Sequence, residues 1–158
     1  MTNKITIIDY GVGNILSLKN AVSSCGHDTI VTNKPKEIES ATHIILPGVG
    51  AFSAAMEKLQ SLNLINPLTK AKNNESFILG ICLGMQLLFS QSEEFKITNG
   101  LNFIEGEIKK LDKFESGIDV KLPHIGWQKC NFNSSEKINI LENISSNDEF
   151  YFVHSYAL

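Results

Sequence analysis

The chain has 158 residues, of which 42% are hydrophobic and 20% are charged, and its formal net charge is −3. This composition is typical of a globular protein, and the length suits a single domain. No basic patch dominates and no segment approaches the roughly 20 apolar residues of a membrane span, so neither nucleic acid nor a membrane is an expected partner.

The first 91 residues alternate between short apolar runs and segments with helical spacing. The expected strands are residues 4–11, 28–32, 42–48 and 77–81, and the expected helices are residues 14–26, 34–40, 50–62, 64–74 and 83–91. We expect the strand at 77–81 to be buried and the helix at 64–74 to be interrupted by Pro67. Alternation of this kind predicts an α/β fold with a mainly parallel sheet flanked by helices.

The second half of the chain is richer in strand patterns than in helix patterns. Residues 101–111, 118–132 and 149–158 carry these patterns, which predict added antiparallel strands. The last segment, "YFVHSYAL", runs to residue 158 as an apolar strand with no turn or helix to close it. We therefore expect one domain over residues 1–158 that lacks its C-terminal part.

Three cysteines, Cys25, Cys82 and Cys130, form an odd set without a close pair. This spacing predicts neither a disulfide framework nor a zinc site, so no metal is expected, and a cytoplasmic protein with reduced thiols is the simplest interpretation. Cys25 and Cys130 have the pattern of ordinary core residues.

Cys82 stands between Gly80 and Gly84, where the last expected strand becomes a helix. The pattern Gly-x-Cys-x-Gly at such a junction is typical of a nucleophile elbow, a strained turn that lifts the central side chain out of the sheet. The helix that follows favours a thiolate, and the backbone N–H of Leu83 is placed for an oxyanion hole. The alternative is a small core cysteine at a tight turn.

A second oxyanion donor is expected from "LPGVGAF" at residues 46–52, which follows another strand and should emerge at the same edge of the sheet. The candidates are Val49 and Gly50; an ordinary strand–helix turn is the alternative. A third glycine loop, "DYGVGN" at residues 9–14, lacks the last glycine of a dinucleotide fingerprint and the acidic residue after the second strand. No nucleotide cofactor, and no other cofactor, is expected.

The four histidines provide no confident base for the cysteine. His27 and His43 precede expected strands, so they should lie at the edge opposite Cys82, and His124 and His154 sit among apolar neighbours, as buried structural histidines do. The residues alone therefore indicate a nucleophile and an oxyanion hole, without a base.

Four motifs occur together in this order: "LPGVGAF", "GICLGMQLLF", "LPHIGW" and "YFVHSY". With "IIDYGVGN" near the start, they resemble class I glutamine amidotransferases, and more narrowly the glutaminase subunits of imidazole glycerol phosphate synthase. Met85, after the elbow glycine, supports the narrower likeness. The family's "His-Pro-Glu" motif, which carries its base and orienting carboxylate, is not found in the sequence.

The resemblance implies that Cys82 attacks the side-chain amide of glutamine to form a thioester and ammonia. It implies substrate contacts from Gly50, Gln86, Glu94, Ser155 and Tyr156. It also implies a heterodimer with a cyclase subunit that is built as a (β/α)8 barrel and receives the ammonia in histidine biosynthesis. Asn14, Trp127 and Tyr151 match positions near that interface, and a core or edge aromatic is the alternative for Trp127.

Two other functions remain open at this point. Paralogous amidotransferases that supply ammonia for a cell-surface sugar carry nearly the same motifs. The other alternative is a catalytically inactive binding module that docks on a partner and regulates it. The absent base favours such a module, whereas the Gly80-Cys82-Gly84 elbow argues against it.

Overall fold

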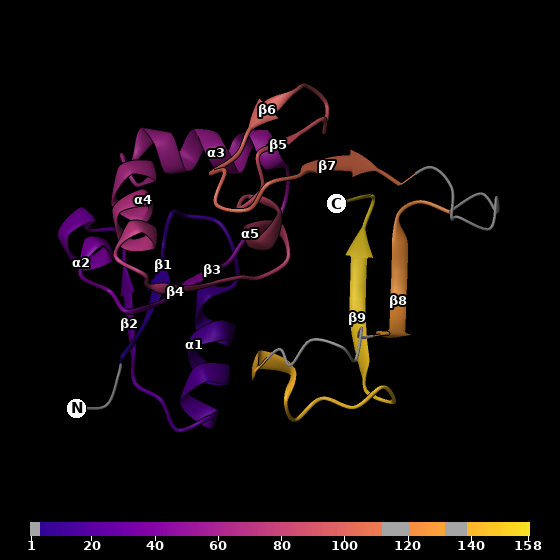
Figure 1. Cartoon of the computed structure of the whole chain (residues 1–158), viewed down its shortest axis with the longest axis horizontal. Helices are drawn as coiled ribbons and strands as arrows, with labels where there is room; N and C mark the ends of the chain where they lie inside the picture. Colours follow the sequence, from indigo (N-terminus) through magenta and orange to yellow (C-terminus); the bar gives the residue numbers. More distant parts are fainter. Residues whose placement is uncertain (1–3, 112–120, 132–138) are drawn as a thin grey trace. The chain divides into compact units, whose positions relative to one another are not determined.

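The computed structural model describes residues 4–111, 121–131 and 139–158. The chain divides into two compact units, Met1–Lys109 with Leu158 and Lys110–Ala157. The first unit contains a parallel sheet with helices, and the second contains an antiparallel pair of strands (Figure 1).

The first unit is built on a four-stranded sheet in the order β2-β1-β3-β4. Its strands are β1 (Ile5–Ile8), β2 (Thr29–Thr32), β3 (His43–Leu46) and β4 (Phe77–Gly80). Every neighbouring pair is parallel, with Ile7 opposite both Val31 and Ile45. The carboxyl ends of the four strands therefore lie at one edge of the sheet, where the loops of the expected site begin.

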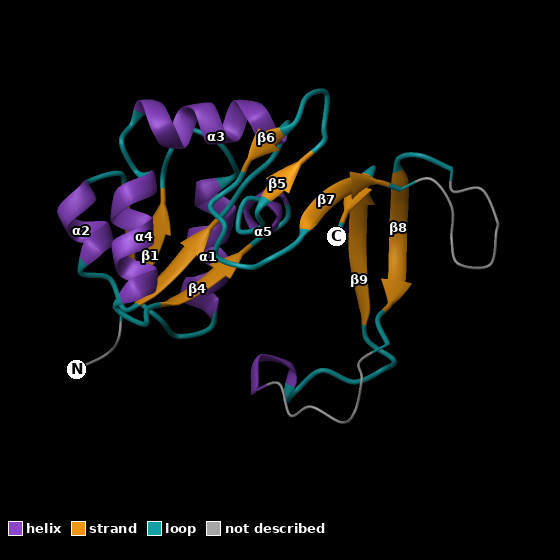
Figure 2. Cartoon of the chain, turned by 45° about the horizontal axis from the view of Figure 1, so that its top comes forward, coloured by secondary structure: helices purple, strands orange, loops and turns teal. Residues whose placement is uncertain are grey.

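Helices cover both faces of this sheet. They are α1 (Ile15–Ser24), α2 (Pro35–Glu39), α3 (Phe52–Ser61), α4 (Ile65–Asn73) and the short α5 (Leu83–Gln86). Helix α1 lies on one side, and α2, α3 and α4 lie on the other (Figures 1 and 2). Right-handed crossovers require this, because the chain moves from β1 to β2 in one direction and from β2 through β3 to β4 in the other. The predicted α/β fold is confirmed.

The central strands β1 and β3 are buried on both faces, as their continuous apolar runs predict. On the α1 side, Ile7, Val22 and Ile45 pack together. The core on the other side contains Ile8, Ile44 and Leu46 from the sheet and Ile38, Phe52, Leu59, Leu64 and Leu68 from α2, α3 and the start of α4. Helix α3 buries the one-sided apolar stripe that its sequence spacing indicates.

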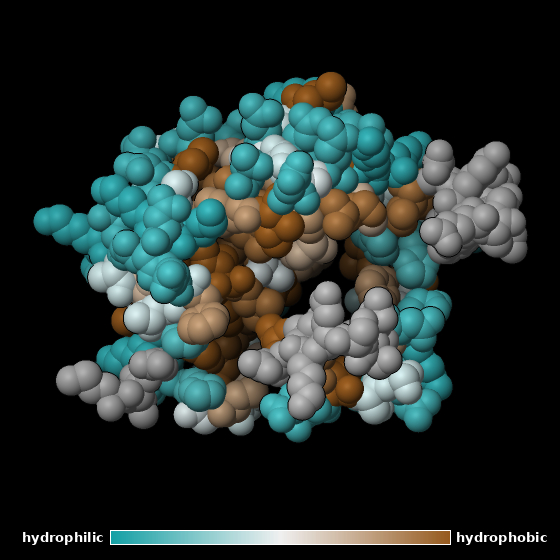
Figure 3. Space-filling model, in the orientation of Figure 1, coloured by the Kyte–Doolittle hydropathy of each residue, from teal (hydrophilic) through white to brown (hydrophobic). Residues whose placement is uncertain are grey.

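Strand β4 is not the buried strand that the sequence predicts. Phe77 is 72% exposed and Leu79 is 42% exposed, and Figure 3 shows an apolar area over the first unit where β4 runs. Leu79 pairs with Ile45, so its side chain lies on the α1 face of the sheet. In the described chain, α1 contacts β1 and β2, whereas β4 is the edge strand on the far side of β3. The apolar run predicts that residues 77–80 form a strand, but whether that strand is buried depends on which helix packs against it.

Two helices differ from their expected form. Pro67 does not interrupt α4, because it is the third residue of that helix, where no intrahelical partner for its N–H is needed. Helix α5 ends at Gln86 and does not continue to residue 91. The carbonyls of Leu87 and Leu88 instead accept hydrogen bonds from Leu101 and Phe103, both at 2.8 Å.

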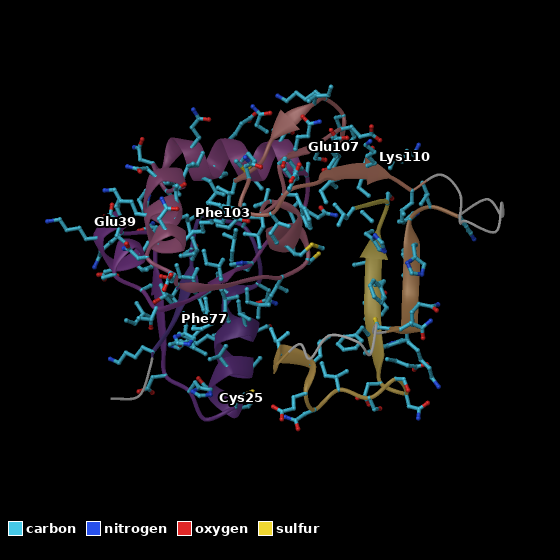
Figure 4. All side chains as sticks on the ribbon, in the orientation of Figure 1. Cys25, Glu39, Phe77, Phe103, Glu107 and Lys110 are labelled. Atoms are coloured by element: carbon cyan, nitrogen blue, oxygen red, sulfur yellow. The ribbon has the colours of Figure 1, made fainter. Side chains whose placement is uncertain are left out.

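Cys25 also differs from its expected core position. It is exposed at the C-terminal cap of α1, one residue beyond the last helical turn (Figure 4). Cys130 is half-buried. The helical spacing includes Cys25 in the apolar stripe of residues 14–26, but the helix ends at Ser24 and Cys25 is its exposed C-cap residue.

The remaining strands of the first unit are short. They are β5 (Gln91–Ser92), β6 (Thr98–Asn99) and β7 (Glu107–Lys110), and β5 pairs antiparallel with β6 and parallel with β7. No helix in the part of the chain that the structure describes is long and apolar enough to cross a membrane.

The second unit contains the antiparallel hairpin of β8 (His124–Lys129) and β9 (Glu149–His154). A 3-10 turn at Asn139–Leu141 and the two-residue strand β10 (Tyr156–Ala157) complete its described elements. The antiparallel strands expected within residues 118–132 and 149–158 are therefore present, whereas β7, in the expected segment 101–111, pairs parallel with β5. Residues 118–120 and 132 of the expected segment lie outside the described residues.

Candidate active site

Cys82 lies at the junction between β4 and α5, at the carboxyl edge of the parallel sheet. Its backbone has φ +54° and ψ −120°, and its side chain is exposed. A non-glycine residue with positive φ is strained, and such strain costs about 1–3 kcal/mol and is found preferentially at functional sites. The sharp turn that the sequence predicts is thus present, and the residue at its centre is exposed.

The two glycines beside Cys82 are required by close backbone contacts. A Cβ atom added to Gly80 would lie 2.4 Å from the Cα of Met85. A Cβ on Gly84 would lie 1.9 Å from the carbonyl oxygen of Leu46. At Gly84 the elbow therefore packs directly on the end of β3, and a side chain there would force these two segments apart. A side chain at Gly80 would instead clash with the backbone of α5.

The loop after β3 lies against the start of α5. A Cβ on Gly48 would lie 2.7 Å from the backbone nitrogen of Gly84, and Gly50 has φ +89° with open space around it. The carbonyl of Pro47 accepts a 2.7 Å hydrogen bond from the Tyr10 hydroxyl. This arrangement brings the expected oxyanion donors, the backbone around Val49 and Gly50 and that of Leu83, to the same edge as Cys82.

Tyr10 was not among the predicted site residues, yet its hydroxyl holds the loop after β3 at this edge of the sheet. Its side chain is 1% exposed, and burial raises the pKa of its hydroxyl above the ordinary value. The neutral hydroxyl is therefore retained and anchors the start of the loop that contains Gly48. The available signal was the position of a tyrosine two residues after the end of the first strand, at the edge where the glycine loops meet.

Glu94 reaches the opposite end of the same loop. Its carboxylate oxygen Oε2 accepts a 2.7 Å hydrogen bond from the backbone N–H of Phe52, the first residue of α3. Ala51, the N-cap residue of α3, provides no side-chain cap, so a carboxylate from 42 residues away satisfies this helix terminus. Gln86, another substrate candidate of the first unit, is half-buried in α5.

Ser155 and Tyr156 belong to the second unit. Ser155 lies between β9 and β10, and its carbonyl accepts a 2.9 Å hydrogen bond from the backbone N–H of Leu111. Both residues are half-buried. The structure thus assembles Cys82, Leu83, Gln86, Glu94 and the loop of Gly50 within the first unit, and places the other two candidates in the second.

The interface candidates occupy distinct structural positions. Asn14 is exposed, and its Oδ1 accepts a 3.1 Å hydrogen bond from the N–H of Ser17 at the start of α1. Trp127 and Tyr151 face each other across the β8–β9 hairpin with ring centroids 5.5 Å apart. They are 63% and 55% exposed, so Trp127 is not a core aromatic of the described chain.

His27 and His43 lie at the edge of the sheet that their sequence positions predict, whereas His124 and His154 are half-buried and not fully buried as expected. His43 begins β3 and pairs with Phe77 at the start of β4, and His27 precedes β2, so both are at the edge opposite Cys82. His124 and His154 pair with each other in the second unit. Among residues 4–111, 121–131 and 139–158, no group of three His, Cys, Asp or Glu side chains is arranged to hold a metal ion.

A surface hollow of about 530 Å³ lies elsewhere, between α2 and the end of α4. Its lining includes Lys70 and Glu39, which form a 3.1 Å ion pair. It also includes Ser40 and Asn74, which lie close to the amino ends of β3 and β4. This hollow is therefore at the opposite edge of the sheet from Cys82 and is not part of the candidate site.

Comparison with solved structures shows the fold. A crystal structure of a glutamine amidotransferase aligns with a TM-score of 0.62 at 15% identity, covering 78% of this chain and 62% of that chain. A crystal structure of a putative GMP synthase protein from Thermoplasma acidophilum aligns with a TM-score of 0.62 at 20% identity, covering 99% of this chain and 66% of that chain. This chain therefore spans less than two thirds of either structure.

Sequence comparison shows the family. The imidazole glycerol phosphate synthase subunit HisH 2 of Methanococcus maripaludis is 46% identical over 153 residues, which cover 96% of this chain and 73% of that protein. The HisH subunit of Bacillus cytotoxicus is 41% identical over 152 residues, covering 96% of this chain and 69% of that protein. The family model described as glutamine amidotransferase class-I matches residues 6–158. The chain therefore belongs to the class I glutamine amidotransferase family.

Proposed function

We propose that this chain carries the glutaminase activity of an imidazole glycerol phosphate synthase, in histidine biosynthesis. The names of the relatives from Methanococcus maripaludis and Bacillus cytotoxicus support this assignment. The single observation that carries the chemistry is the strained elbow, in which exposed Cys82 has φ +54° directly after the parallel strand β4. We also propose that residues 1–158 represent one amidotransferase domain, with a cytoplasmic location.

In the proposed reaction, the Cys82 thiolate attacks the side-chain amide carbon of glutamine. The carbonyl oxygen becomes an oxyanion, and the N–H groups of Leu83 and of the Val49–Gly50 segment are its proposed donors. Collapse of the intermediate breaks the C–N bond and, with a proton, releases ammonia. Water then cleaves the thioester to give glutamate and the free thiol. We assign no base among the described residues.

Gly50 gives the oxyanion loop its conformational freedom. Its φ of +89° is one that glycine adopts without strain, and a Cβ added there would meet nothing within 4 Å. In this scheme the Val49–Gly50 peptide rotates, so that an N–H points toward or away from the substrate. Loss of one oxyanion donor typically reduces kcat about a hundred- to thousand-fold. Engagement of a partner that biases this rotation would couple glutamine hydrolysis to the use of ammonia.

We propose that Glu94 holds the amino group of glutamine, with Gln86, Gly50, Ser155 and Tyr156 as further contacts. The carboxylate of Glu94 already bonds to the first N–H of α3, beside the oxyanion loop. In this scheme Oε2 of Glu94 accepts from Phe52 N–H at the end of the loop, and Oε1 accepts from the ammonium group of glutamine. Substrate binding and loop position would then depend on one side chain.

The proposed partner is a cyclase subunit with the form of a (β/α)8 barrel, which makes a heterodimer with this chain and receives the ammonia. Asn14, Trp127 and Tyr151 are the proposed contact residues. The exposed aromatic pair supports this, because large exposed aromatic side chains are enriched at protein interfaces.

The proposal is tested by labelling the whole chain with a glutamine analogue that carries a diazoketone in place of the amide. We expect covalent attachment to Cys82, protection by excess glutamine, and no attachment to Cys25. Cys25 is a matched control because it is also exposed, so iodoacetamide should reach both thiols. Mass spectrometry of peptides locates the label.

A second variant separates substrate recognition from thiol reactivity. Glu94→Gln keeps an oxygen that accepts from Phe52 N–H but removes the charge, so labelling by the analogue should weaken while labelling of Cys82 by iodoacetamide is unchanged. Equal attachment of the analogue to Cys25 and Cys82, or labelling that glutamine does not suppress, would refute the proposed glutaminase.

A further inference from the structure

Two histidines face each other at the end of the β8–β9 hairpin, outside the elbow. His124 and His154 are directly opposed in the strand register. The Nδ1 atom of His124 lies 3.1 Å from the Nε2 atom of His154, and the Nδ1 atom of His154 lies 3.1 Å from the carbonyl oxygen of Tyr156. Both side chains are half-buried. The two rings therefore form a chain of hydrogen bonds that ends on the backbone of Tyr156.

One arrangement of protons satisfies both hydrogen bonds when the two rings are neutral. A carbonyl oxygen only accepts, so His154 must carry its proton on Nδ1 to donate to Tyr156. Its Nε2 is then an acceptor, and His124 must also carry its proton on Nδ1. The two contacts thus define the tautomer of each ring, because a neutral imidazole carries its proton on only one nitrogen. The hydrogen bond made by one nitrogen therefore fixes whether the other is protonated.

The rings are also held by packing against one aromatic neighbour. The Phe152 ring lies 5.7 Å from His124 in a stacked arrangement and 5.7 Å from His154 in a tilted one. The two imidazoles meet edge to face at 72°, with centroids 5.2 Å apart. Their orientation is therefore determined by shape as well as by hydrogen bonds.

The pair acts on the segment where the chain changes strand. β9 ends at His154, Ser155 follows, and β10 begins at Tyr156. The His154 ring spans this break to the carbonyl of Tyr156, while the carbonyl of Ser155 accepts from Leu111 N–H. Both consecutive carbonyls are thus held, and the turn that presents the Ser155 and Tyr156 side chains has a defined backbone.

We infer that His124 and His154 are positioning residues for the glutamine site, acting through the backbone of Ser155 and Tyr156. The inference rests on the proposed function, in which these two residues contact the substrate. Neither histidine is the base of the reaction in this scheme. His154 holds the turn through its Nδ1–H, and His124 holds His154 in the tautomer that makes this donation possible.

The first test is spectroscopic and needs no substrate. Nitrogen-15 NMR of the histidine rings in the whole chain, near neutral pH, should show His124 and His154 both protonated on Nδ1. Exposed His27 provides the internal reference, and His124→Phe and His154→Phe assign the signals. A neutral ring at either position with its proton on Nε2 would overturn the inference.

Hydrogen exchange then reports whether the pair holds the turn. The Leu111 amide, which bonds to Ser155, should exchange faster in His154→Phe than in the native chain. His154→Asn should retain slow exchange, because its amide N–H can replace Nδ1–H as a donor to Tyr156. Unchanged exchange in a folded His154→Phe variant would contradict the holding role.

The last test measures affinity for L-glutamine by calorimetry in a Cys82→Ser background, which prevents turnover. We expect His154→Phe to weaken glutamine binding about tenfold, which corresponds to the loss of roughly one hydrogen bond between neutral groups. His154→Asn should weaken binding less. His27→Phe should have no effect. Equal affinity for His154→Phe and its parent would overturn the positioning role. If the Cys82→Ser parent itself binds no glutamine, the proposed function fails. The NMR and hydrogen-exchange measurements still test whether the histidine pair holds the turn.

Discussion

The two units differ in how their side chains are shielded from water. In the first unit, residues such as Ile7, Ile38 and Leu59 are fully buried between the sheet and its helices. In the second unit, no residue among those that the structure describes is buried, and order comes from the β8–β9 ladder and its aromatic contacts. The comparison teaches that the first unit carries its own hydrophobic core, whereas the hairpin depends on pairing and ring packing.

The largest expected effect is a steric one in the first unit. Gly84→Ala places a Cβ 1.9 Å from the Leu46 carbonyl oxygen, so β3 and the elbow cannot keep their contact. We expect the free energy of unfolding to fall by more than about 4 kcal/mol, measured by urea denaturation.

Gly26→Ala is the matched control for that substitution. Gly26 has φ +81° but nothing within 4 Å of the added Cβ, so only backbone strain of about 1–2 kcal/mol is expected. If both variants unfold at the same urea concentration, the close contact at the elbow does not contribute as we argue.

The second prediction compares the two units directly. Leu59→Ala removes a fully buried side chain and should lower the free energy of unfolding by about 2–4 kcal/mol. Trp127→Ala removes a larger side chain that is 63% exposed, and its expected cost is below about 1 kcal/mol. Thermal or urea unfolding followed by circular dichroism measures both. A larger loss for Trp127→Ala would mean that the hairpin contributes to the core of the folded chain.

The smallest expected effect depends on pH and belongs to Tyr10. Burial raises the pKa of its hydroxyl in the folded state, whereas the unfolded chain ionises near the ordinary value of about 10. The stabilisation that the neutral, buried Tyr10 hydroxyl contributes to the folded state is therefore complete below about pH 10. It is lost as the pH rises toward the folded-state pKa. Alkaline unfolding should begin as the unfolded tyrosine ionises, and urea midpoints between pH 7 and pH 11 measure it.

Tyr10→Phe should change this pH profile in a specific way. The variant loses the hydrogen bond to the Pro47 carbonyl and should be less stable by about 1 kcal/mol at pH 7, with a flatter decline above pH 10. Tyr151→Phe is the control, since Tyr151 is 55% exposed. A decline above pH 10 that persists unchanged in Tyr10→Phe would show that another group causes it.

Most elements of the first unit were predictable because their signals are local. Short, mainly apolar runs define β1 and β3, and the spacing of Phe52, Ala55, Met56 and Leu59 defines α3. The glycines beside Cys82 indicated the elbow, since only a crowded backbone requires them. Each of these features is encoded within about ten residues of sequence.

The failures share a dependence on distant partners. Helix α5 stops early because residues 101–104 supply hydrogen bonds to Leu87 and Leu88, which no local pattern reveals. The exposure of Phe77 depends on which helix covers β4, and the bond of Glu94 to Phe52 joins residues 42 positions apart. The tautomers of the histidine pair follow from contacts and cannot be read from "LPHIGW" or "YFVHSY".

The positive φ of Cys82 sets stability and reactivity against each other at a single position. Glycine is the residue that tolerates this backbone without strain, so Cys82→Gly should relieve about 1–2 kcal/mol while it eliminates the thiol. Laboratory evolution for heat resistance alone would therefore drift toward glycine here, and the melting temperature would rise while the nucleophile is lost. A stabilisation screen on this protein needs a thiol-dependent readout to keep position 82 intact.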